Sequence, residues 1–207
     1  MLNNDNYTDV QRKIVEAARH LFVKKGIKGT TVRDIAKVAD VNVAMVNYYF
    51  RSKENLFATI FDEAFGILSE RIFYLIDADL PFFELIRRWV YSYYDLLWEY
   101  PDLPIFVLNE LAKNPHILDD KFKLKDPYQL YVKLAFRIRE EEKKGLIHPV
   151  PVSDFLLNII SLSIFPFAAK PVVTQFLHLS DTQYMDLASK HKEYVADFII
   201  RAIKVEK

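Results

Sequence analysis

Two short amphipathic patterns, separated by only three residues, constrain the fold of this chain more than any other feature. In the first, over residues 32–39, the apolar side chains repeat at the spacing of one helix face: Val32, Ile35, Ala36 and Ala39. The second covers residues 43–49 and follows Asn42, a good N-cap residue. Two helices joined by so short a connection form a helix-turn-helix, whose second helix enters the major groove of DNA. Residues 30–57 are therefore predicted to bind DNA.

The sequence also predicts where the neighbouring helices begin. Thr31 followed by Asp34 supplies a hydroxyl and a carboxylate that can satisfy the unpaired backbone amides of a helix start. Ser52 can cap a third helix that opens with Lys53, which places a cation within reach of a phosphate group. A preceding helix over residues 10–25 carries an apolar stripe suited to bracing the pair.

The stretch from residue 26 to residue 57 resembles the N-terminal domain of TetR-family transcriptional regulators. The matching residues are spread over the whole stretch: Gly26, Thr30, Thr31, Asp34, Ile35, Ala36, Ala39, Tyr48, Tyr49, Phe50, Ser52, Lys53, Glu54, Asn55 and Leu56. Asp40 replaces a turn glycine of the family pattern, although aspartate tolerates the left-handed conformation better than most residues. Asn42 and Val43 replace the Ser-Lys or Ser-Arg pair that often opens the recognition helix, so the base sequence that is read stays undefined.

The resemblance implies two sets of DNA-contacting residues. Thr31 and Lys53 stand at positions that contact phosphate in the family, and Tyr48 or Tyr49 adds a hydroxyl. The residues implied to face the major groove are Asn42, Val43, Ala44, Asn47 and Tyr48. Asn47 can pair with adenine through two hydrogen bonds, and a valine or alanine side chain can meet a thymine methyl group. Two alternatives stay open: the asparagine before the helix only caps it, and Tyr49 only packs.

The distribution of charge agrees with a DNA-binding N-terminal part. The whole chain has 28 Lys and Arg residues and 28 Asp and Glu residues, so its net charge is zero. Residues 1–57 hold ten of the basic and six of the acidic residues, an excess of four positive charges that phosphates attract. Residues 58–207 hold the other 18 basic and 22 acidic residues.

Helical periodicity without strand-like alternation predicts an all-α protein. We expect a small three-helix domain over residues 1–52 and a larger helical domain over residues 53–207. The larger domain begins with a helix of about 25 residues that connects the two, and all nine prolines lie beyond it. The prolines divide the remainder into helical segments over residues 81–100, 104–113, 127–144, 152–165 with a broken continuation to 177, and 181–204.

Composition excludes several classes of protein. The chain is 51% hydrophobic and 14% aromatic, which indicates a folded protein, and it has no cysteine for disulfides, thiol catalysis or cysteine-ligated zinc. The longest charge-free apolar stretch, residues 155–169, would span about 22 Å as a helix, short of a hydrocarbon core of about 30 Å. The first residues show no secretory signal pattern, so we expect a cytoplasmic protein.

Aromatic residues are concentrated in the second domain, because 24 of the chain's 30 follow residue 57. In the family this domain commonly encloses a cavity for a small effector, and an aromatic cavity would suit an apolar or planar one. The candidate ligand-binding residues are Trp89, Tyr93, Trp98, Phe106, Asn109, Glu110, Tyr131 and Phe136. The alternative is that these residues fill the core.

The resemblance also implies a homodimer on a pseudo-palindromic operator, because one helix-turn-helix reads only a few base pairs. The family's usual interface lies on the helices expected over residues 152–165 and 181–204. The candidate interface residues are Leu156, Ile160, Tyr184, Leu187, His191, Val195 and Phe198. The alternative is that both helices fill the core of the monomer. Effector binding would change the spacing of the two recognition helices and weaken operator binding. The resemblance to the family also favours a repressor over an activator.

Two other functions fit the sequence less well. An all-α enzyme of the isoprenoid-synthase type needs an aspartate-rich magnesium site, whereas the pair Asp119-Asp120 is followed by Lys121 and Phe122. The histidines lack metal-binding spacing and there is no phosphate-binding glycine loop, so we expect no cofactor, metal site or catalysis. A DNA-bound adaptor controlled by a protein partner stays open, and an exposed apolar groove without an enclosed cavity would favour it.

Overall fold

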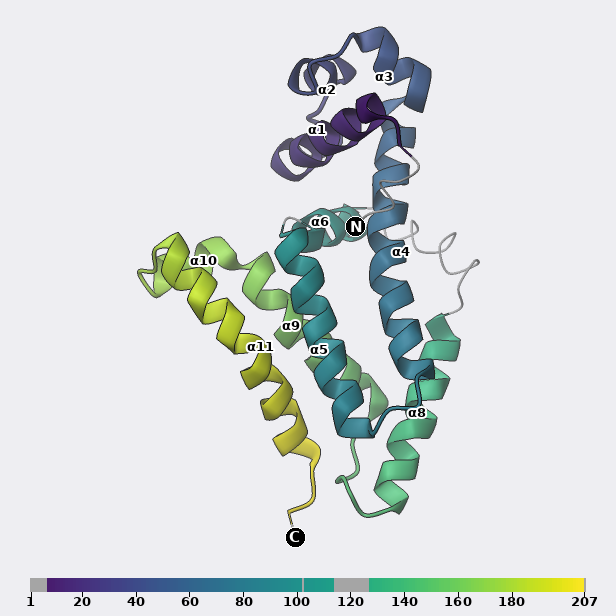
Figure 1. Cartoon of the computed structure of the whole chain (residues 1–207), viewed down its shortest axis with the longest axis vertical. Helices are drawn as coiled ribbons and strands as arrows, with labels where there is room; N and C mark the ends of the chain where they lie inside the picture. The colour runs from purple at the N-terminus through teal and green to yellow at the C-terminus, as the bar shows by residue number, and fades with distance from the viewer. Residues whose placement is uncertain (1–6, 102, 114–126, 207) are drawn as a thin grey trace. The chain divides into compact units, whose positions relative to one another are not determined.

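The computed structural model describes residues 7–101, 103–113 and 127–206, without the side chains of residues 64, 65, 68, 69, 71, 110, 113 and 127. All regular structure in these ranges is helical, apart from one isolated bridge between Ile147 and Lys204. The helices are α1 (Asp9–Lys25), α2 (Val32–Val38), α3 (Val43–Phe50), α4 (Lys53–Asp77), α5 (Phe82–Glu99), α6 (Leu103–Lys113), α8 (Pro127–Lys143), α9 (Val152–Ala168), α10 (Lys170–Phe176) and α11 (Asp181–Ile203) (Figure 1). The predicted all-α fold is confirmed.

The first three helices begin and end at residues that stabilise helix ends locally. Thr8 caps α1 by accepting a hydrogen bond from the amide three residues on, and Gly26 ends the helix with a φ of 69°. Thr31 and Asp34 form the predicted capping box at the start of α2. Asp40 takes the left-handed conformation expected of the turn residue, with a φ of 53°. The left-handed conformation of Asp40 turns the chain from α2 toward α3.

The chain divides into two compact units, and the division cuts α4 and also the first turn of α6. The described residues of Met1–Ser69 and Ile105–Lys121 form the first unit, and those of Glu70–Pro104 and Phe122–Lys207 form the second. The domain boundary expected after residue 52 stays a prediction. The first turns of α4 are buried with the helix-turn-helix. Leu56 and Phe61 are fully buried, and the ring of Phe57 lies 5.4 Å from the ring of Phe22 in α1.

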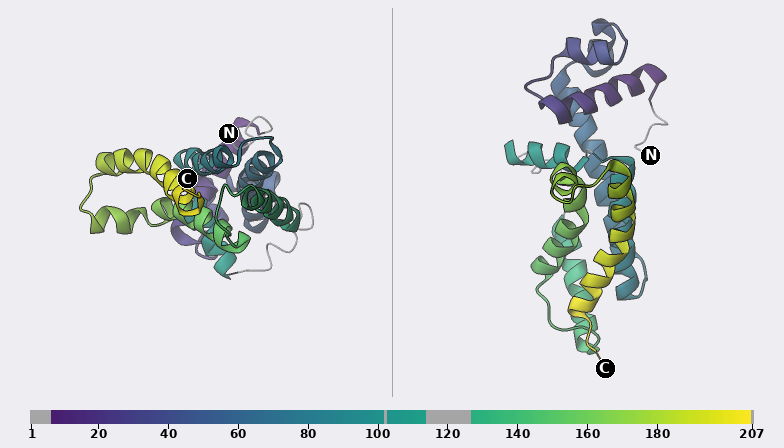
Figure 2. Two further views of the ribbon diagram at one scale, coloured as in Figure 1. Left: turned by 90° about the horizontal axis from the view of Figure 1, so that it is seen from below. Right: turned by 90° about the vertical axis from the view of Figure 1, so that its left-hand side faces the viewer.

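In the second unit, α5 is the central helix. It packs against both α9 and α11, which lie along it in the two figures (Figure 1 and Figure 2). Its inward face is made of buried, mostly aromatic and aliphatic residues: Leu85, Ile86, Trp89, Val90, Tyr93 and Tyr94. The ring of Phe155 in α9 lies 6.5 Å from that of Trp89, and the ring of Phe167 lies 5.2 Å from that of Tyr94. The second unit therefore has an aromatic core between α5 and α9.

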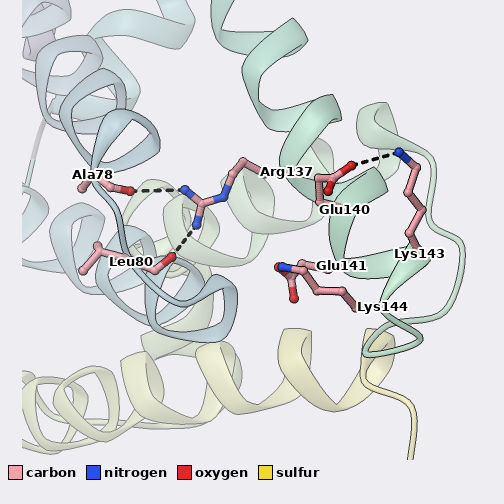
Figure 3. Close-up of polar contacts among 7 residues, drawn as sticks. All are labelled: Ala78, Leu80, Arg137, Glu140, Glu141, Lys143 and Lys144. Atoms are coloured by element: carbon pink, nitrogen blue, oxygen red, sulfur yellow. Dashed lines mark hydrogen bonds and ion pairs between the residues drawn. The ribbon is translucent and has the colours of Figure 1, made fainter.

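Helix α8 holds the C-terminal end of α4. The guanidinium of Arg137 donates hydrogen bonds to the carbonyl oxygens of Ala78, over 3.2 Å, and of Leu80 (Figure 3). The ammonium of Lys133 lies 2.5 Å from a carboxylate oxygen of Asp77. Cations are favourably placed at a helix C-terminus, where carbonyl oxygens lack partners within the helix. These contacts therefore stabilise the turn that leads from α4 to α5.

Pro166 lies inside α9, which continues past the predicted end at residue 165 as far as Ala168. Proline lacks the amide hydrogen that would bond within the helix, and its ring crowds the preceding turn. The helix ends at Ala169, where the predicted continuation becomes α10 and turns away by 70°. Within the described ranges, no single helix has the length and apolar character to cross a membrane. Helices α9 and α10 meet the length and apolarity criteria only together, as a bent pair.

Candidate nucleic-acid interface

The helix α3 is fixed by its inner face and by its start. Val46 and Phe50 are buried on the inner face, and α2 packs against both α3 and α1. The side-chain oxygen of Asn42 accepts a hydrogen bond of 2.9 Å from the amide of Ala44, which caps the first turn. The cap uses only the side-chain oxygen of Asn42, so its amide nitrogen keeps two N–H donors for a base. Capping and base contact are therefore compatible at this residue.

The outer face of α3 presents Ala44, Asn47 and Tyr48, which we call the outer stripe. These residues stand at helix positions i, i+3 and i+4, and all three are exposed. Tyr48 is 80% exposed, and its ring meets that of Tyr49 edge to face at 5.1 Å. Tyr49 and Val43 are half-buried and border the stripe. The outer stripe can therefore enter a groove of DNA without disturbing the core.

Thr31 is exposed, but its hydroxyl is already engaged. The hydroxyl donates to a carboxylate oxygen of Asp34 over 2.7 Å and accepts a bond of 3.1 Å from the Asp34 amide. These bonds from the Thr31 side chain and backbone, helped by the charges of Lys25 and Lys37, lower the pKa of the Asp34 carboxyl. Since a hydroxyl has one hydrogen to donate, Thr31 can reach a phosphate only by giving up this bond.

Lys53 joins the start of α4 to the turn between α1 and α2. Its ammonium donates to the carbonyl oxygen of Ile27 over 2.8 Å and to that of Thr30 over 2.9 Å. An ammonium has three donors, so one is left for a phosphate. This structural role was missed by the sequence interpretation, because 23 to 26 residues separate the partners and no local pattern connects them.

The turn that receives Lys53 is closely packed. Thr30 is fully buried, and its hydroxyl lies 2.9 Å from the carbonyl oxygen of Gly26. A side chain at Gly29 would collide with the carbonyl oxygen of Lys25, so this position needs glycine. The turn therefore depends on particular residue types. In the sequence, the two glycines and the threonine at positions 26, 29 and 30 indicate such a turn.

Exposed cations surround the helix-turn-helix. They are Lys13, Lys24, Lys25, Lys28, Arg33, Lys37 and Arg51. Arg33 lies in the first turn of α2, and Arg51 directly follows α3 with a φ of 63°. The sequence interpretation singled out neither arginine, although their positions beside the two helix ends could have indicated them. Their guanidinium groups are the type that binds phosphate in pairs of hydrogen bonds.

Residues 14–60, from within α1 to the start of α4, match the profile of the family described as bacterial regulatory proteins, tetR family. The capped α2, the turn at Asp40 and the exposed α3 all lie within this match. The chain belongs to the TetR family. It is a transcriptional regulator of that family, as the resemblance of residues 26–57 implied.

Known relatives extend the likeness beyond the helix-turn-helix. YttP of Bacillus subtilis, named a probable HTH-type transcriptional regulator, is 29% identical to this TetR-family chain over 172 residues, which are 81% of each protein. IcaR of Staphylococcus aureus, named the negative transcriptional regulator of the biofilm operon icaADBC, is 32% identical over 96 residues, 41% of this chain and 52% of IcaR. The structure of a TetR-family regulator from Haemophilus influenzae shares the fold over 95% of this chain and 97% of its own, with a TM-score of 0.64 at 19% identity.

The candidate ligand residues of this TetR-family protein differ in burial. Three are buried: Trp89, Tyr93 and Phe106. Four are half-buried or exposed: Trp98, Asn109, Tyr131 and Phe136. The side chain of Glu110 lies outside the described part of the structure. Burial raises the pKa of Tyr93 to about 12, so its hydroxyl stays protonated at neutral pH.

Two other features of the second unit bear on ligand binding. Tyr94 Oη and Ser163 Oγ are buried in the core without a hydrogen-bond partner. An open groove of about 500 Å³ lies between α4 and α5, lined by Tyr74, Leu75, Arg88, Tyr91, Ser92 and Asp95. None of these residues was singled out from the sequence. Among the described residues, no group of three or more His, Asp or Glu side chains could hold a metal ion.

The candidate dimer residues lie on different faces of α9 and α11. Tyr184 and Val195 are buried in the chain's own core, where the Tyr184 hydroxyl donates to the carbonyl oxygen of Pro166 over 3.1 Å. Leu156, Leu187 and His191 are half-buried, whereas Ile160 and Phe198 are exposed. The residues most exposed beside them, Leu157 and Tyr194, were missed. Helical spacing finds an apolar face but does not tell a core face from an interface.

Proposed function

We propose that this protein is a cytoplasmic, non-catalytic repressor that binds a pseudo-palindromic operator as a homodimer and leaves it when a small apolar effector binds. The observation that carries the proposal is the outer stripe of α3. Ala44, Asn47 and Tyr48 are exposed on a helix whose caps and inner face are fixed, which is the arrangement that reading base edges requires. The similarity to IcaR, which is named a negative transcriptional regulator, favours repression.

The outer stripe and its neighbours divide the work of DNA binding. Asn47 pairs with adenine through two hydrogen bonds, while Val43 and Ala44 meet a thymine methyl group. Tyr48, with its hydroxyl exposed, donates to a phosphate and fixes the docking. Tyr49 and the remaining donor of Lys53 add phosphate contacts at the edge, as does Thr31 once its hydroxyl gives up the bond to Asp34. Asn42 reaches a base with its amide nitrogen. Arg33 and Arg51 supply further positive charge.

The dimer in this proposal forms through the exposed apolar residues of α9 and α11. Leu157 and Ile160 are 66% and 37% exposed on α9, and Tyr194 and Phe198 are 64% and 52% exposed on α11. The rings of Tyr194 and Phe198 stack with their centres 6.3 Å apart, so the two exposed side chains form one continuous apolar surface. The half-buried Leu156, Leu187 and His191 border this surface. A second copy would remove it from water, which is the main favourable term in association.

The effector in this proposal binds in the aromatic core of the second unit. Tyr94 Oη and Ser163 Oγ lack partners there, and an unpaired buried polar group costs about 1–3 kcal/mol. An apolar effector with a hydrogen-bond acceptor would satisfy the tyrosine donor. By linkage, an effector that weakens operator binding by about 1–3 kcal/mol must itself bind more weakly when the operator is bound. Tyr94→Phe should therefore stabilise the free protein and weaken its binding of the effector.

A gel-shift experiment tests the DNA-binding part of the proposal. The protein is mixed with DNA from upstream of its own gene, and then with that DNA and a panel of apolar ligands. Asn47→Ala should relax the base preference at one position and cost about 1–3 kcal/mol. Asn55→Ala, which removes the same amide from an exposed site on α4, is the matched control and should bind like the wild type. No binding at low salt would refute the proposed function.

A DNA-bound adaptor is the second candidate. The groove between α4 and α5 favours it, because a groove open to solvent can receive a segment of another protein. Tyr91→Ala changes this groove without touching the outer stripe. If it abolished regulation while every small ligand left operator binding unchanged, the adaptor would replace the effector-controlled repressor.

A further inference from the structure

The short helix α10 is attached to the second unit but contributes nothing to its core. None of its seven residues is buried. Val172 and Phe176, one turn apart, are 64% and 81% exposed. Leu177, which follows the helix, and Phe165, which precedes the bend, are 48% and 61% exposed. We call these four residues the corner patch.

The structure shows how α10 is held, and the contacts are polar. The Lys170 ammonium lies 3.1 Å from a carboxylate oxygen of Asp181 and 5.0 Å from the centre of the Tyr184 ring. The Thr174 hydroxyl donates to the carbonyl oxygen of Lys170 over 2.9 Å. A helix of two turns does not persist in water by itself, because isolated helices shorter than about 12–15 residues are marginal. A second surface packed against the corner patch would supply the stabilisation that α10 lacks.

The charge of the corner patch restricts what can cover it. Residues 171–180 contain no Lys, Arg, Asp or Glu, and Lys170 is already paired. A helix that lies on a membrane surface carries Lys or Arg on its polar face, and a DNA contact needs cations for phosphate. An uncharged apolar patch fits another uncharged apolar surface, and two copies of the same patch do not repel each other.

The exposed area also points to a second copy of this chain. A standard interface buries about 800 Å² on each partner. Taking about 150–250 Å² for a whole aromatic side chain, the exposed parts of Tyr194 and Phe198 provide roughly 170–290 Å². Phe165 and Phe176 add roughly 210–360 Å² on the same basis. The two rings of the corner patch thus provide more than half of the exposed aromatic area on α9, α10 and α11.

We propose that α10 is a dimerisation arm, whose corner patch packs against the exposed apolar face of α9 and α11 of a second copy. This inference rests on the proposed homodimer and names the element that completes it. The 70° bend after α9 directs α10 away from the line of that helix, so the arm can reach beyond the chain's own core. In a two-fold dimer each arm meets the partner once, so one substitution removes two contacts.

Sedimentation at several protein concentrations tests the arm with Phe176→Glu. Gln175→Glu is the matched control, because it introduces the same charge at the neighbouring exposed position of α10. We expect the dimer dissociation constant to rise by about tenfold or more in Phe176→Glu and to stay within about threefold in Gln175→Glu. Circular dichroism should show the same helix content in both, since residue 176 makes no core contact.

The outcomes separate the arm from the dimer itself. A wild type that stays monomeric at all concentrations would refute the proposed homodimer. A dimer that tolerates Phe176→Glu but is broken by Phe198→Glu would refute the arm and leave the homodimer standing. Wild-type protein that co-sediments with phosphatidylcholine vesicles, while Phe176→Glu does not, would assign the corner patch to a lipid surface and also refute the arm.

Discussion

Lys53→Met is the perturbation that separates a structural from a DNA-binding role for this residue. Methionine keeps most of the length of the side chain and removes the ammonium that bonds the carbonyl oxygens of Ile27 and Thr30. Two hydrogen bonds to a charged group would sum to about 3–6 kcal/mol. The cation also sits in the first turn of α4, where the helix dipole opposes it by about 0.3–1 kcal/mol, and it is partly hydrated. We expect the free energy of unfolding to fall by about 2–4 kcal/mol.

Urea denaturation measures this loss, with Lys28→Met as the matched control. Lys28 is an exposed lysine of the same turn, so its substitution removes the same charge without removing a carbonyl contact. We expect less than about 0.5 kcal/mol for Lys28→Met. Equal stability of the two variants would refute the structural role of Lys53.

A second measurement on the same variant reports on DNA. The affinity for a random-sequence duplex is measured against salt concentration, at a temperature where both variants are folded. If the third donor of Lys53 contacts a phosphate, the slope of log affinity against log salt falls by about 0.9. An unchanged slope together with lowered stability would assign Lys53 to the fold alone.

Three further substitutions follow from the contacts of the described residues. Arg137→Ala removes the two hydrogen bonds at the end of α4 (Figure 3) and should lower the free energy of unfolding by about 1.5–3 kcal/mol. Lys144→Ala, which removes an exposed lysine from its pair with Glu141, should cost under about 1 kcal/mol in the same urea titration. Gly29→Ala should lower the melting temperature because of its collision with a backbone carbonyl, whereas Gly66→Ala, with open space inside α4, should raise it or leave it unchanged. Burial lowers the pKa of His191 below its ordinary value of 6.5. The neutral buried imidazole therefore contributes stability above pH 6.5, and this contribution is lost as pH falls through the lowered pKa. His191→Gln should flatten that part of the plot of stability against pH.

Local features of this fold were predictable because the interacting residues lie within four positions of each other. The Thr31–Asp34 capping box, the Asn42 cap and the left-handed Asp40 all depend on such short distances along the chain. Helix ends followed to within a few residues from the apolar spacing and the prolines. The exposed outer stripe follows from the same spacing, because the inward residues Val46 and Phe50 set the rotation of α3.

Contacts between distant residues were not predictable from one sequence. Lys53 could be recognised as a cation near a helix start, but its carbonyl partners depend on how α1 packs over α4. Arg137 lies 57 to 59 residues from the carbonyl oxygens it holds. Tyr184 and Val195 have the same apolar character and spacing as the exposed residues of α11, and only the packing of α5 and α9 decides which face is buried. Tertiary packing, rather than propensity, settles these cases.

The outer stripe and the turn beneath it meet different physical demands. Thr30, Gly29 and Lys53 are tied to backbone carbonyl oxygens or to a close backbone approach, so each tolerates few replacements. Asn47 and Tyr48 point to solvent and meet almost nothing else in the chain, so their replacement costs little stability. Base preference can therefore change at the outer stripe while the turn keeps α3 in place. Under the proposed function, that separation would let a chain with Asn42 and Val43 at the start of α3 keep the family's fold and read a different base sequence.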